Sequence, residues 1–349
     1  MNEQALTGKP KIVATNPVFP ETRALLEQHA TLEVNPALEP WSHEEIRSRC
    51  RDAAGLLAFM TDSIDAEFLL ACPNLRVIGA ALKGFDNIDV QAATDAGVWL
   101  TIVPDLLTVP TAELTIGLML SLGRNIVAGD RSIKQNGFHG WRAELYGAGL
   151  AGATVGVIGF GLVGRAIAQR LAGFECRLLA YDQSISRELE ETLPPQVTLA
   201  SFQDLITRSD YIVLALPLTA ETRHIINSKT IEEMKAGVRI VNPARGSLVD
   251  EAAIADAIDR GHVSGYAADV FECEDWALKD RPTGIDPRLT NASAPTVFTP
   301  HIGSGVTEIR RQIELSAARS ILDALAGRVP FGAVNHPVNQ FRHAQSGAR

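Results

Sequence analysis

Three short segments carry side chains that together suit proton transfer and the binding of a small anion. They are Asn242-Pro243-Ala244-Arg245-Gly246, Asp269-Val270-Phe271-Glu272-Cys273-Glu274-Asp275 and Thr299-Pro300-His301-Ile302-Gly303. Each follows a short apolar run of the kind expected for a buried strand. A histidine backed by a carboxylate forms an acid/base pair, and the planar guanidinium of an arginine suits oxyanions. The sequence therefore predicts a site in which Arg245 binds an anion and His301 exchanges a proton.

Each of these residues also has an ordinary interpretation when it is considered alone. Arg245 fits a surface salt bridge, the acids from Glu272 to Asp275 fit a solvated run, and His301 fits a histidine bonded within the core. Ligands of Rossmann-type folds bind outside the carboxyl ends of the strands. Because all three segments follow strands of the same α/β half of the chain, we favour the catalytic interpretation.

A dinucleotide-binding motif precedes these segments. Gly159-Phe160-Gly161-Leu162-Val163-Gly164 has the G-x-G-x-x-G pattern, directly after an expected strand at Thr154–Ile158, which is the context that the motif requires. Gly159 permits the tight turn, Gly161 lets the backbone approach a pyrophosphate, and Gly164 lets helix and strand pack closely. The free N–H groups at the start of the helix then face the phosphates.

Asp182 ends the next expected strand. A carboxylate there accepts hydrogen bonds from the adenosine ribose and repels a 2′-phosphate, which predicts NAD rather than NADP. The alternative is a structural glycine turn followed by a solvated aspartate.

Lys83 stands where another apolar run, Leu75 to Leu82, stops. A buried ammonium is costly unless an anion pairs with it. The side chain therefore either reaches water or binds an anion, and the residues alone leave both interpretations open.

The elements expected around these residues alternate between strands and helices, which predicts a parallel α/β fold. We expect two Rossmann-like doubly wound domains, with a nucleotide domain at 108–302 inserted into a substrate domain made of 1–107 and 303–349. A long helix from Thr111 to about Gly137 and a last helix from about Thr307 to Leu325 are expected. The other expected strands are Lys11–Thr15, Thr31–Val34, Gly55–Phe59, Leu75–Leu82, Val98–Val103, Arg177–Tyr181, Tyr211–Leu216, Val238–Val241, Gly265–Val270 and Thr296–Phe298.

Composition narrows the class of protein. The 349 residues are enough for about two domains, and 46% of them are hydrophobic. A net charge of −9 argues against nonspecific nucleic-acid binding. No apolar run is long enough for a membrane span, and Met1 to Lys11 lack the apolar core of a signal peptide. Four scattered cysteines favour reduced thiols over disulfides or zinc. We therefore expect a cytoplasmic protein without a metal site.

The ordered set G-x-G-x-x-G, N-P-A-R-G, D-V-F-E-x-E and T-P-H-I-G resembles the D-2-hydroxyacid dehydrogenase family over nearly the whole chain. This resemblance implies that Arg245 binds the substrate anion, that His301 is the acid/base and that Glu274 is its partner. It also implies a small-molecule substrate, NAD as cofactor and a homodimer formed through the nucleotide domain. The residues expected to contact the cofactor are Thr111, Gly159, Phe160, Gly161, Leu162, Val163, Gly164, Asp182, Pro217, Ala244, Asp269 and His301.

Within the family, A-L-K-G-F-D-N around Lys83 and V-P-D-L-L-T-V-P-T-A-E from Val103 to Glu113 resemble the members that oxidise phosphite. That likeness implies NAD-dependent oxidation of phosphite to phosphate, with Lys83 as a second cation beside Arg245. The further residues expected at the substrate are Met60, Gly84, Trp141, Tyr146 and Arg310. For Met60, Trp141 and Tyr146, packing in a core or an interface is an equal alternative.

Two other functions remain open from the sequence. One is a hydroxyacid dehydrogenase of the glyoxylate or hydroxypyruvate reductase type, for which a neutral residue at position 83 is expected. The other is a non-catalytic NAD-sensing corepressor, for which a damaged Arg–Glu–His set or added binding segments are expected, and the chain shows neither.

Overall fold

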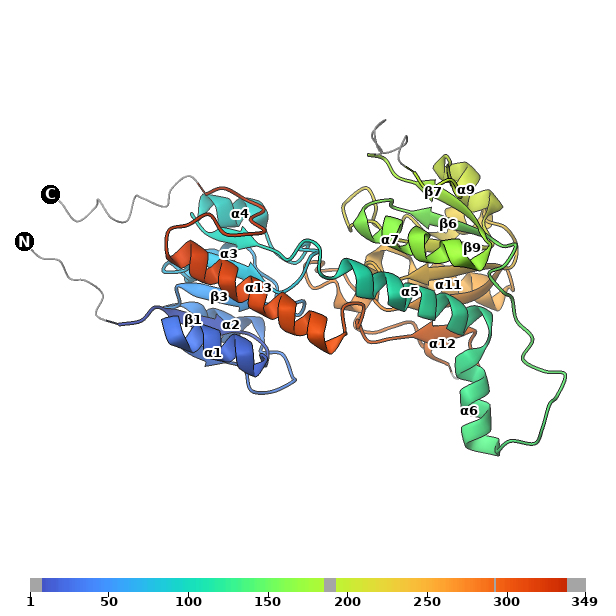
Figure 1. Ribbon diagram of the computed structural model, residues 1–349, viewed down its shortest axis with the longest axis horizontal. Helices are drawn as coiled ribbons and strands as arrows, with labels where there is room; N and C mark the ends of the chain where they lie inside the picture. Colours follow the sequence, from blue (N-terminus) through green and yellow to red (C-terminus); the bar gives the residue numbers. More distant parts are fainter. Residues whose placement is uncertain (1–7, 185–192, 292, 338–349) are drawn as a thin grey trace, which may run out of the picture. The chain divides into compact units, whose positions relative to one another are not determined.

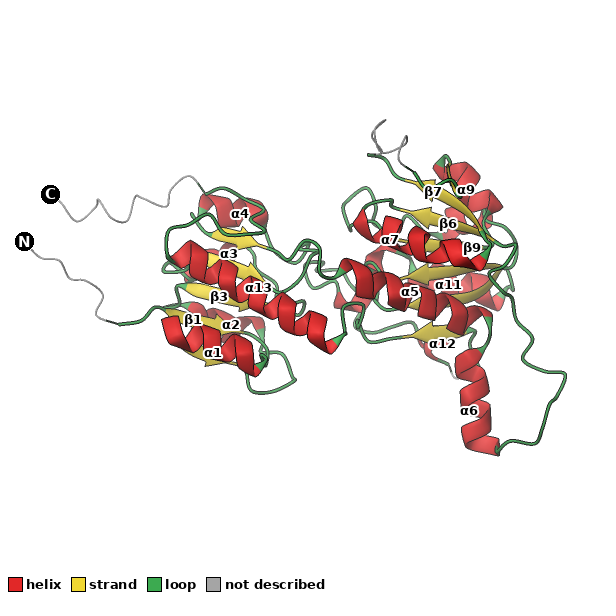
Figure 2. Cartoon of the chain, viewed as in Figure 1, coloured by secondary structure: helices red, strands yellow, loops and turns green. Residues whose placement is uncertain are grey.

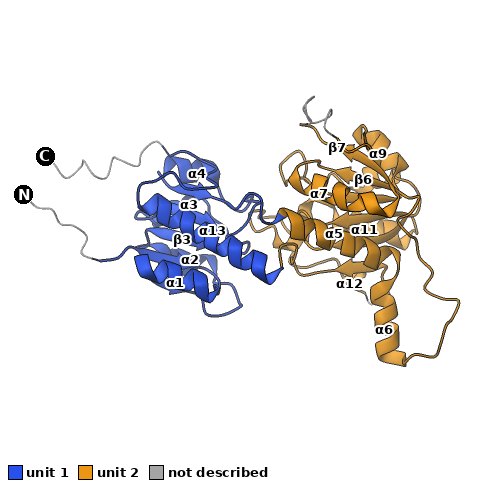
Figure 3. Ribbon diagram, viewed as in Figure 1, with its two compact units in different colours: residues 1–107, 306–349 blue, residues 108–305 orange. Residues whose placement is uncertain are grey.

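The computed structural model describes residues 8–184, 193–291 and 293–337. The predicted tail after Asn335 lies mostly outside these residues. The chain forms two compact units, one of residues 1–107 and 306–349 and the other of residues 108–305 (Figure 3). The predicted division had its second boundary at 303. No helix in the described ranges is long and apolar enough to cross a membrane.

The first unit is built on a five-stranded parallel sheet in the order β2-β1-β3-β4-β5. Helix α13 covers one face of this sheet (Figure 1). It packs closely because Gly79 has no side chain: a Cβ there would lie 2.5 Å from Cγ1 of Ile321. The elements of this unit are β1 Lys11–Ala14, α1 Pro20–His29, β2 Thr31–Val34, α2 His43–Cys50, β3 Gly55–Ala58, α3 Ala66–Ala71, β4 Val77–Ala80, α4 Val90–Asp95, β5 Trp99–Thr101 and α13 Thr307–Leu325.

The second unit contains a seven-stranded parallel sheet in the order β12-β11-β10-β9-β6-β7-β8, with helices on both faces (Figure 2). Its strand elements are β6 Thr154–Ile158, β7 Arg177–Tyr181, β8 Val197–Leu199, β9 Tyr211–Leu214, β10 Val238–Asn242, β11 Val263–Ala268 and β12 Thr296–Phe298. The helical elements are α5 Thr108–Gly123, α6 Ile126–Asn136, α7 Leu162–Leu171, η1 Ala172–Phe174, α9 Phe202–Arg208, α10 Ser228–Glu232, η2 Gly246–Leu248, α11 Glu251–Asp259, η3 Glu272–Glu274 and α12 Pro287–Thr290.

The central strands of this sheet are buried on both faces. In β9, Val213 packs into the cluster beneath α5 and α7, whereas Ile212 and Leu214 pack into the cluster on the α11 side. Two-sided burial explains why these strands read as continuous apolar runs instead of alternating ones. The predicted α/β class, with two parallel sheets, is confirmed.

Two details of the prediction were wrong. The helix expected from Thr111 to Gly137 is two helices, because Asn125 adopts the left-handed conformation with φ 53° and ends the helical run. Asparagine tolerates this region better than most residues. The short edge strand β8 was also missed, since its three residues give too little periodicity to recognise.

Candidate active site

Except for Thr111 on α5, the predicted catalytic and cofactor residues of the second unit lie on the segments that follow its parallel strands, at one edge of the sheet. Reading across the sheet, His301 follows β12, Asp269 follows β11, Arg245 follows β10 and Asp182 follows β7. The glycine turn at 159–164 follows β6, and Pro217 follows β9. Strand order reverses direction between β6 and β9, and the crevice at such a switch point is where α/β sheets bind nucleotides.

His301 and Glu274 lie in contact. Nδ1 of His301 is 3.0 Å from Oε2 of Glu274, and both side chains are about one quarter exposed. The other carboxylate oxygen of Glu274 accepts a hydrogen bond from the backbone N–H of Phe271 at 3.0 Å, which fixes the carboxylate on its own turn. With Nδ1 engaged, Nε2 of His301 is the nitrogen left to face a substrate. This arrangement is that of an oriented acid/base.

Arg245 lies on the turn that enters η2. Asn242 shapes this turn, because its side-chain amide donates to the carbonyl of Arg245 at 2.8 Å while its Oδ1 accepts from the N–H of Ala244 at 3.1 Å. The Arg245 guanidinium donates to the carbonyl of Ala244 at 2.8 Å. Gly246 allows the turn to pack backbone to backbone, since a Cβ there would lie 1.9 Å from the carbonyl carbon of Phe271. The loop bearing Arg245 is thus packed against the turn bearing Glu274.

Asp269 is only 1% exposed and both of its oxygens are engaged within the protein. Oδ1 accepts from the Thr299 hydroxyl at 2.5 Å and from the N–H of Ile302 at 2.8 Å, while Oδ2 accepts from the N–H of Gly303 at 2.7 Å. Burial raises the pKa of the Asp269 carboxyl, and these hydrogen bonds partly offset that. The carboxylate holds the turn around His301, which has φ 52°. Its predicted contact with a nicotinamide stays a prediction.

The three motif glycines meet different surroundings. Gly159 has φ +93°, and a Cβ there would lie 2.6 Å from the backbone of Ala215. A Cβ on Gly164 would lie 2.1 Å from the carbonyl oxygen of Gly159. At Gly161, the N-cap of α7, nothing lies within 4 Å of that position. Two glycines are therefore needed for packing, and the third leaves its backbone open to a pyrophosphate.

Asp182 supports this turn, and its predicted contact with the ribose stays a prediction. Its Oδ2 accepts from the N–H of Phe160 at 2.7 Å, and Oδ1 accepts from the N–H of Ser184 at 2.8 Å. The side chain of Phe160 is 2% exposed, so any contact with a cofactor is through its backbone. Leu162 is 46% exposed at the start of α7. Thr111 lies near Gly303, with its Oγ1 3.3 Å from the position of a Cβ there.

The predicted substrate residues Lys83, Gly84, Met60 and Arg310 lie in the first unit. Lys83 is half-buried and stands beyond the end of β4, not directly at it. Arg310 of α13 donates to the carbonyl of Ala81 at 3.2 Å, which ties this guanidinium to the loop bearing Lys83. Burial lowers the pKa of Arg310, and Glu314 partly offsets this.

Two buried polar side chains connect the loops that carry the predicted substrate residues of the first unit. Asp62 accepts from the Thr15 hydroxyl at 2.6 Å and from the N–H of Phe59 at 2.7 Å. Asn87 donates to the carbonyl of Asp62 at 2.6 Å. The loops after β1, β3 and β4 are therefore linked, so that the loop bearing Met60 and the loop bearing Lys83 share one support.

Trp141 and Tyr146 do not join His301 within one chain. They are 77% and 72% exposed on the segment that follows α6. The next residues, Gly147 and Ala148, pack against Gly123 and against the hydroxyl of Tyr211, the first residue of β9. This is the amino end of the strand, and Figure 1 shows α6 and its following loop extending away from the sheet. Their predicted contact with a substrate stays a prediction, since exposure at this end of the sheet is also what the alternative of an interface expects.

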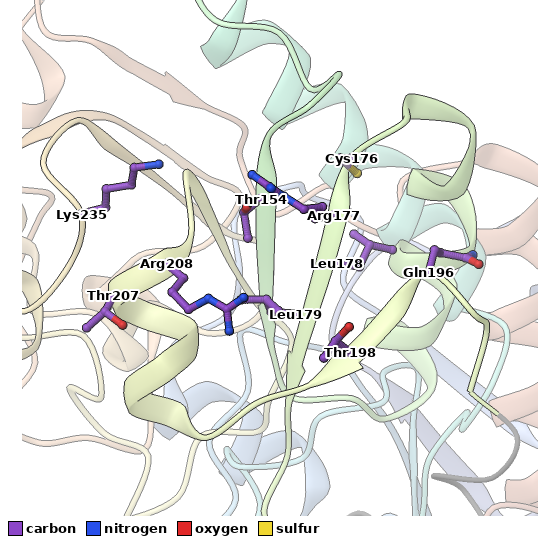
Figure 4. A pocket seen from close by; sticks show the side chains of 10 residues that line it. All are labelled: Thr154, Cys176, Arg177, Leu178, Leu179, Gln196, Thr198, Thr207, Arg208 and Lys235. Atoms are coloured by element: carbon purple, nitrogen blue, oxygen red, sulfur yellow. Dashed lines mark hydrogen bonds between the residues drawn. The ribbon is translucent and has the colours of Figure 1, made fainter.

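A separate hollow also lies at the amino ends of the strands. Arg177, Arg208 and Lys235 are among its lining residues (Figure 4). Lys235 pairs with Asp210 at 2.5 Å, and Arg177 donates to the Thr154 hydroxyl at 3.2 Å. This hollow is on the opposite edge of the sheet from the glycine turn, so it is not where the pyrophosphate is expected.

Comparison with known proteins agrees with this geometry. Residues 116–303 match the family model described as D-isomer specific 2-hydroxyacid dehydrogenase, NAD binding domain. The chain belongs to the D-isomer specific 2-hydroxyacid dehydrogenase family. The matched domain is the NAD-binding one, and NAD is the cofactor.

The relatives extend the similarity over the whole chain. A protein named glyoxylate reductase from Thermofilum pendens is 35% identical over 96% of this chain and 97% of its own length. A glyoxylate reductase from Aeropyrum pernix is 34% identical over 96% and 98%. Among solved structures, the TT0316 protein from Thermus thermophilus superposes with a TM-score of 0.83 at 31% identity, covering 93% of this chain and all of that one.

These relatives overturn the expectation of phosphite oxidation. The similar proteins are named glyoxylate reductase, and none of those described is a phosphite-oxidising enzyme. The expectation came from the likeness of two short segments, and the cations that they add do not correct it, because lysine and arginine bind a carboxylate as well as a phosphorus oxyanion. The alternative of a hydroxyacid dehydrogenase is the one favoured.

A second histidine–glutamate contact lies beside the first and was not predicted. Nε2 of His224 lies 2.5 Å from Oε1 of Glu272, two residues before Glu274 on the same turn. The sequence indicated only that Glu272 belongs to a run of acids, and it gave His224 no role. Their positions in the sequence carry no recognisable spacing, so this pair becomes visible only in the fold.

Proposed function

We propose that this member of the family reduces a small 2-oxoacid of the glyoxylate or hydroxypyruvate type with NADH, and oxidises the corresponding 2-hydroxyacid with NAD⁺. The observation that carries the proposal is similarity to glyoxylate reductases over 96% of the chain. The His301–Glu274 pair beside the Arg245 loop supplies the chemistry that such a reaction needs. Because Arg245, Glu274 and His301 are all present, a non-catalytic corepressor is disfavoured.

In the reductive direction, protonated His301 donates its Nε2 proton to the carbonyl oxygen of the 2-oxoacid as negative charge develops there. Glu274 holds Nδ1, which orients the ring and stabilises the imidazolium before the transfer. Arg245 binds the carboxylate through two parallel N–H donors, so that the neighbouring carbonyl is aligned. In the oxidative direction, neutral His301 accepts the hydroxyl proton instead.

The cofactor, when bound, supplies or accepts the hydride. Backbone amides around Gly161 and the start of α7 would hold its pyrophosphate, and Asp182 would hold its ribose hydroxyls. Lys83 and Gly84 of the first unit remain proposed substrate-binding residues.

The test is the consumption of NADH by the purified protein, followed by its absorbance, with glyoxylate and with hydroxypyruvate. We expect saturable turnover with at least one of them, and the reverse reaction with the matching 2-hydroxyacid. Turnover of phosphite with NAD⁺ at a higher kcat/KM than either 2-oxoacid would overturn the proposal, and so would an absence of turnover with both.

Replacing Asp182 with asparagine is expected to raise the kcat/KM ratio of NADPH over NADH by about tenfold or more. Removing one negative charge near a 2′-phosphate changes the free energy of binding by at least about 1.4 kcal/mol. Asparagine keeps an oxygen acceptor for the Phe160 amide, so the glycine turn is preserved better than with alanine. Steady-state kinetics with both cofactors measure the ratio. An unchanged ratio contradicts the ribose assignment.

We also propose that the chain forms a homodimer through the arm made of α6 and residues 137–149. No residue of α6 is buried. The arm exposes large apolar side chains that a monomer leaves in water, and patches of this kind mark protein interfaces. They are Ile126, Val127, Ile133, Phe138, Trp141, Leu145 and Tyr146.

The double variant Ile133→Glu with Trp141→Glu is expected to sediment as a monomer, because two charges would be buried without partners in the proposed interface. Analytical ultracentrifugation measures this. As a control, Leu70→Glu changes an 84% exposed leucine of the first unit and is expected to leave the dimer intact. A wild-type protein that sediments as a monomer at micromolar concentration contradicts the proposal.

A further inference from the structure

Glu272 is buried beside the proposed catalytic pair and has no role in the reaction described above. It is 9% exposed, and each of its carboxylate oxygens has a partner. Oε1 lies 2.5 Å from Nε2 of His224, and Oε2 accepts from the backbone N–H of Glu251 at 3.1 Å. In return, the N–H of Glu272 donates to Oε1 of Glu251 at 2.9 Å. The two glutamates therefore exchange hydrogen bonds across two separate segments.

These contacts join the segment that follows Arg245 to the segment that ends at Glu274. Glu251 is the first residue of α11, a few residues beyond the Arg245 turn. A second link is made by Asp275, whose Oδ2 accepts from the N–H of Ser247 at 2.7 Å. Next to Ser247, Gly246 lies against the backbone of Phe271 and Glu272 with no room for a side chain. The relative position of the two segments is thus set by three adjacent contacts.

His224 belongs to a third segment that runs along the same turn. Its N–H donates to the carbonyl of Ser247 at 2.8 Å, and the N–H of Ile226 donates to the carbonyl of Leu248 at 3.1 Å. The residue has φ 51°, a left-handed conformation that is uncommon outside glycine, although histidine adopts it more often than most residues do. Such a conformation persists where surrounding contacts hold it, and the contact with Glu272 is one of them.

We propose that Glu272, held by His224 and Glu251, is a positioning residue that fixes the turn bearing Glu274 against the loop bearing Arg245. It acts through these two residues and does not touch substrate or cofactor. A misplacement of about 1 Å can cost about 10²-fold in rate. The contacts of Glu272 with its two partners therefore control how well His301, the proton donor, is aligned with Arg245, which binds the anion. The kinetic test of this inference rests on the proposed function.

The charged groups around Glu272 give a reason for its contact with His224. The pKa of Glu251 is raised to about 7, mainly by burial and also by the nearby charges of Glu272 and Asp286, while backbone hydrogen bonds act to lower it. Glu251 also faces Tyr266 and Cys273, and His224 faces Asp280. Two carboxylates in one buried place repel each other, and the contact between the His224 ring and Glu272 gives one of them a hydrogen-bonding partner.

The first experiment compares Glu272→Gln with the control Glu221→Gln, which removes an exposed charge from the same unit. For Glu272→Gln we expect kcat to fall by about 10-fold to 10²-fold. We also expect the pH at which 2-oxoacid reduction declines to move downward, because Glu274 then stabilises protonated His301 less well. A variant that is only partly folded has a lower rate at every pH, but the pH at which its rate declines does not change. A profile that superposes on that of Glu221→Gln overturns the proposal.

The second experiment does not need activity. Amide hydrogen exchange of Ser247, Glu251 and Glu272 reports on the contacts between the two segments. We expect exchange at these amides to be about tenfold faster in Glu272→Gln than in the control, and unchanged exchange overturns the proposal. If the wild type reduces no 2-oxoacid, the proposed function fails while this measurement still decides the role of Glu272.

A graded pair of variants covers the case in which Glu272→Gln does not fold. His224→Gln keeps an N–H donor at about the reach of Nε2, whereas His224→Ala removes it. Because His224 is one third exposed, both are expected to fold. We expect faster exchange and lower kcat in His224→Ala, with most of the loss restored in His224→Gln. Equal behaviour of the two variants and the wild type overturns the role of the His224–Glu272 contact.

Discussion

Replacing His301 with asparagine is expected to reduce kcat for 2-oxoacid reduction by about 10²-fold to 10⁴-fold, the range typical of losing a general acid. Nδ1 of His301 is held 3.0 Å from Glu274, which leaves Nε2 as the proton donor. Asparagine can donate a hydrogen bond at this place but cannot release a proton at neutral pH. The affinity for NADH, measured by fluorescence titration, is expected to change by less than about threefold.

A matched control for this variant is His139→Asn, which changes an exposed histidine on the arm. We expect wild-type kcat for it, so that a loss in His301→Asn is not a general effect of removing a histidine. A kcat within about tenfold of the wild type in His301→Asn would remove this residue from the role of acid.

Much of the fold is predictable because parallel strands buried on both faces read as apolar runs. The strands at Thr154–Ile158, Arg177–Tyr181 and Thr296–Phe298 were predicted with the bounds that the structure shows, and so was the last helix at Thr307–Leu325. The strand ends predicted for Arg245, Asp269 and His301 follow from the same runs, since a parallel sheet brings all carboxyl ends to one edge.

The pairing of side chains at that edge is less predictable. Glu272 and Glu274 stand on a 3₁₀ turn, in which each residue rotates the chain by about one third of a circle. Because the two glutamates are two residues apart on this turn, their carboxylates point in different directions. That of Glu272 points toward His224 and that of Glu274 toward His301. Sequence periodicity does not reveal such a short turn, so the choice of Glu274 depended on resemblance and not on a physical argument.

Substrate identity was the least predictable property. Lys83 and Arg310 indicate a site for an anion, but a cation attracts carboxylate and phosphorus oxyanions alike. The aromatic residues Trp141 and Tyr146 were placed at the substrate from a local pattern, although the left-handed turn at Asn125 directs their segment away from the sheet. The position of a segment in the fold depends on single turns of this kind earlier in the chain. A local sequence pattern does not show in which direction such a turn sends the residues that follow it.

Replacing Arg245 with alanine is expected to lower kcat/KM for glyoxylate by about 10²-fold to 10⁴-fold. Two charge-assisted hydrogen bonds to a carboxylate, at about 1.5–3 kcal/mol each, account for that range. Arg245→Lys is the matched variant. It keeps the charge but loses the paired donors and the contact with the carbonyl of Ala244, so we expect a loss of only about tenfold, mainly in KM.

Chemical rescue separates binding from folding in this series. Guanidinium added at millimolar concentration is expected to restore part of the activity of Arg245→Ala, because it supplies the missing donors at the same place. It should restore little in Arg245→Lys, whose ammonium occupies that space. Unlike Glu272→Gln, neither variant is expected to shift the pH at which reduction declines, since Arg245 binds the anion and does not orient His301. If Arg245→Ala keeps the wild-type KM for glyoxylate, the carboxylate is bound elsewhere and the roles assigned along this edge of the sheet must change.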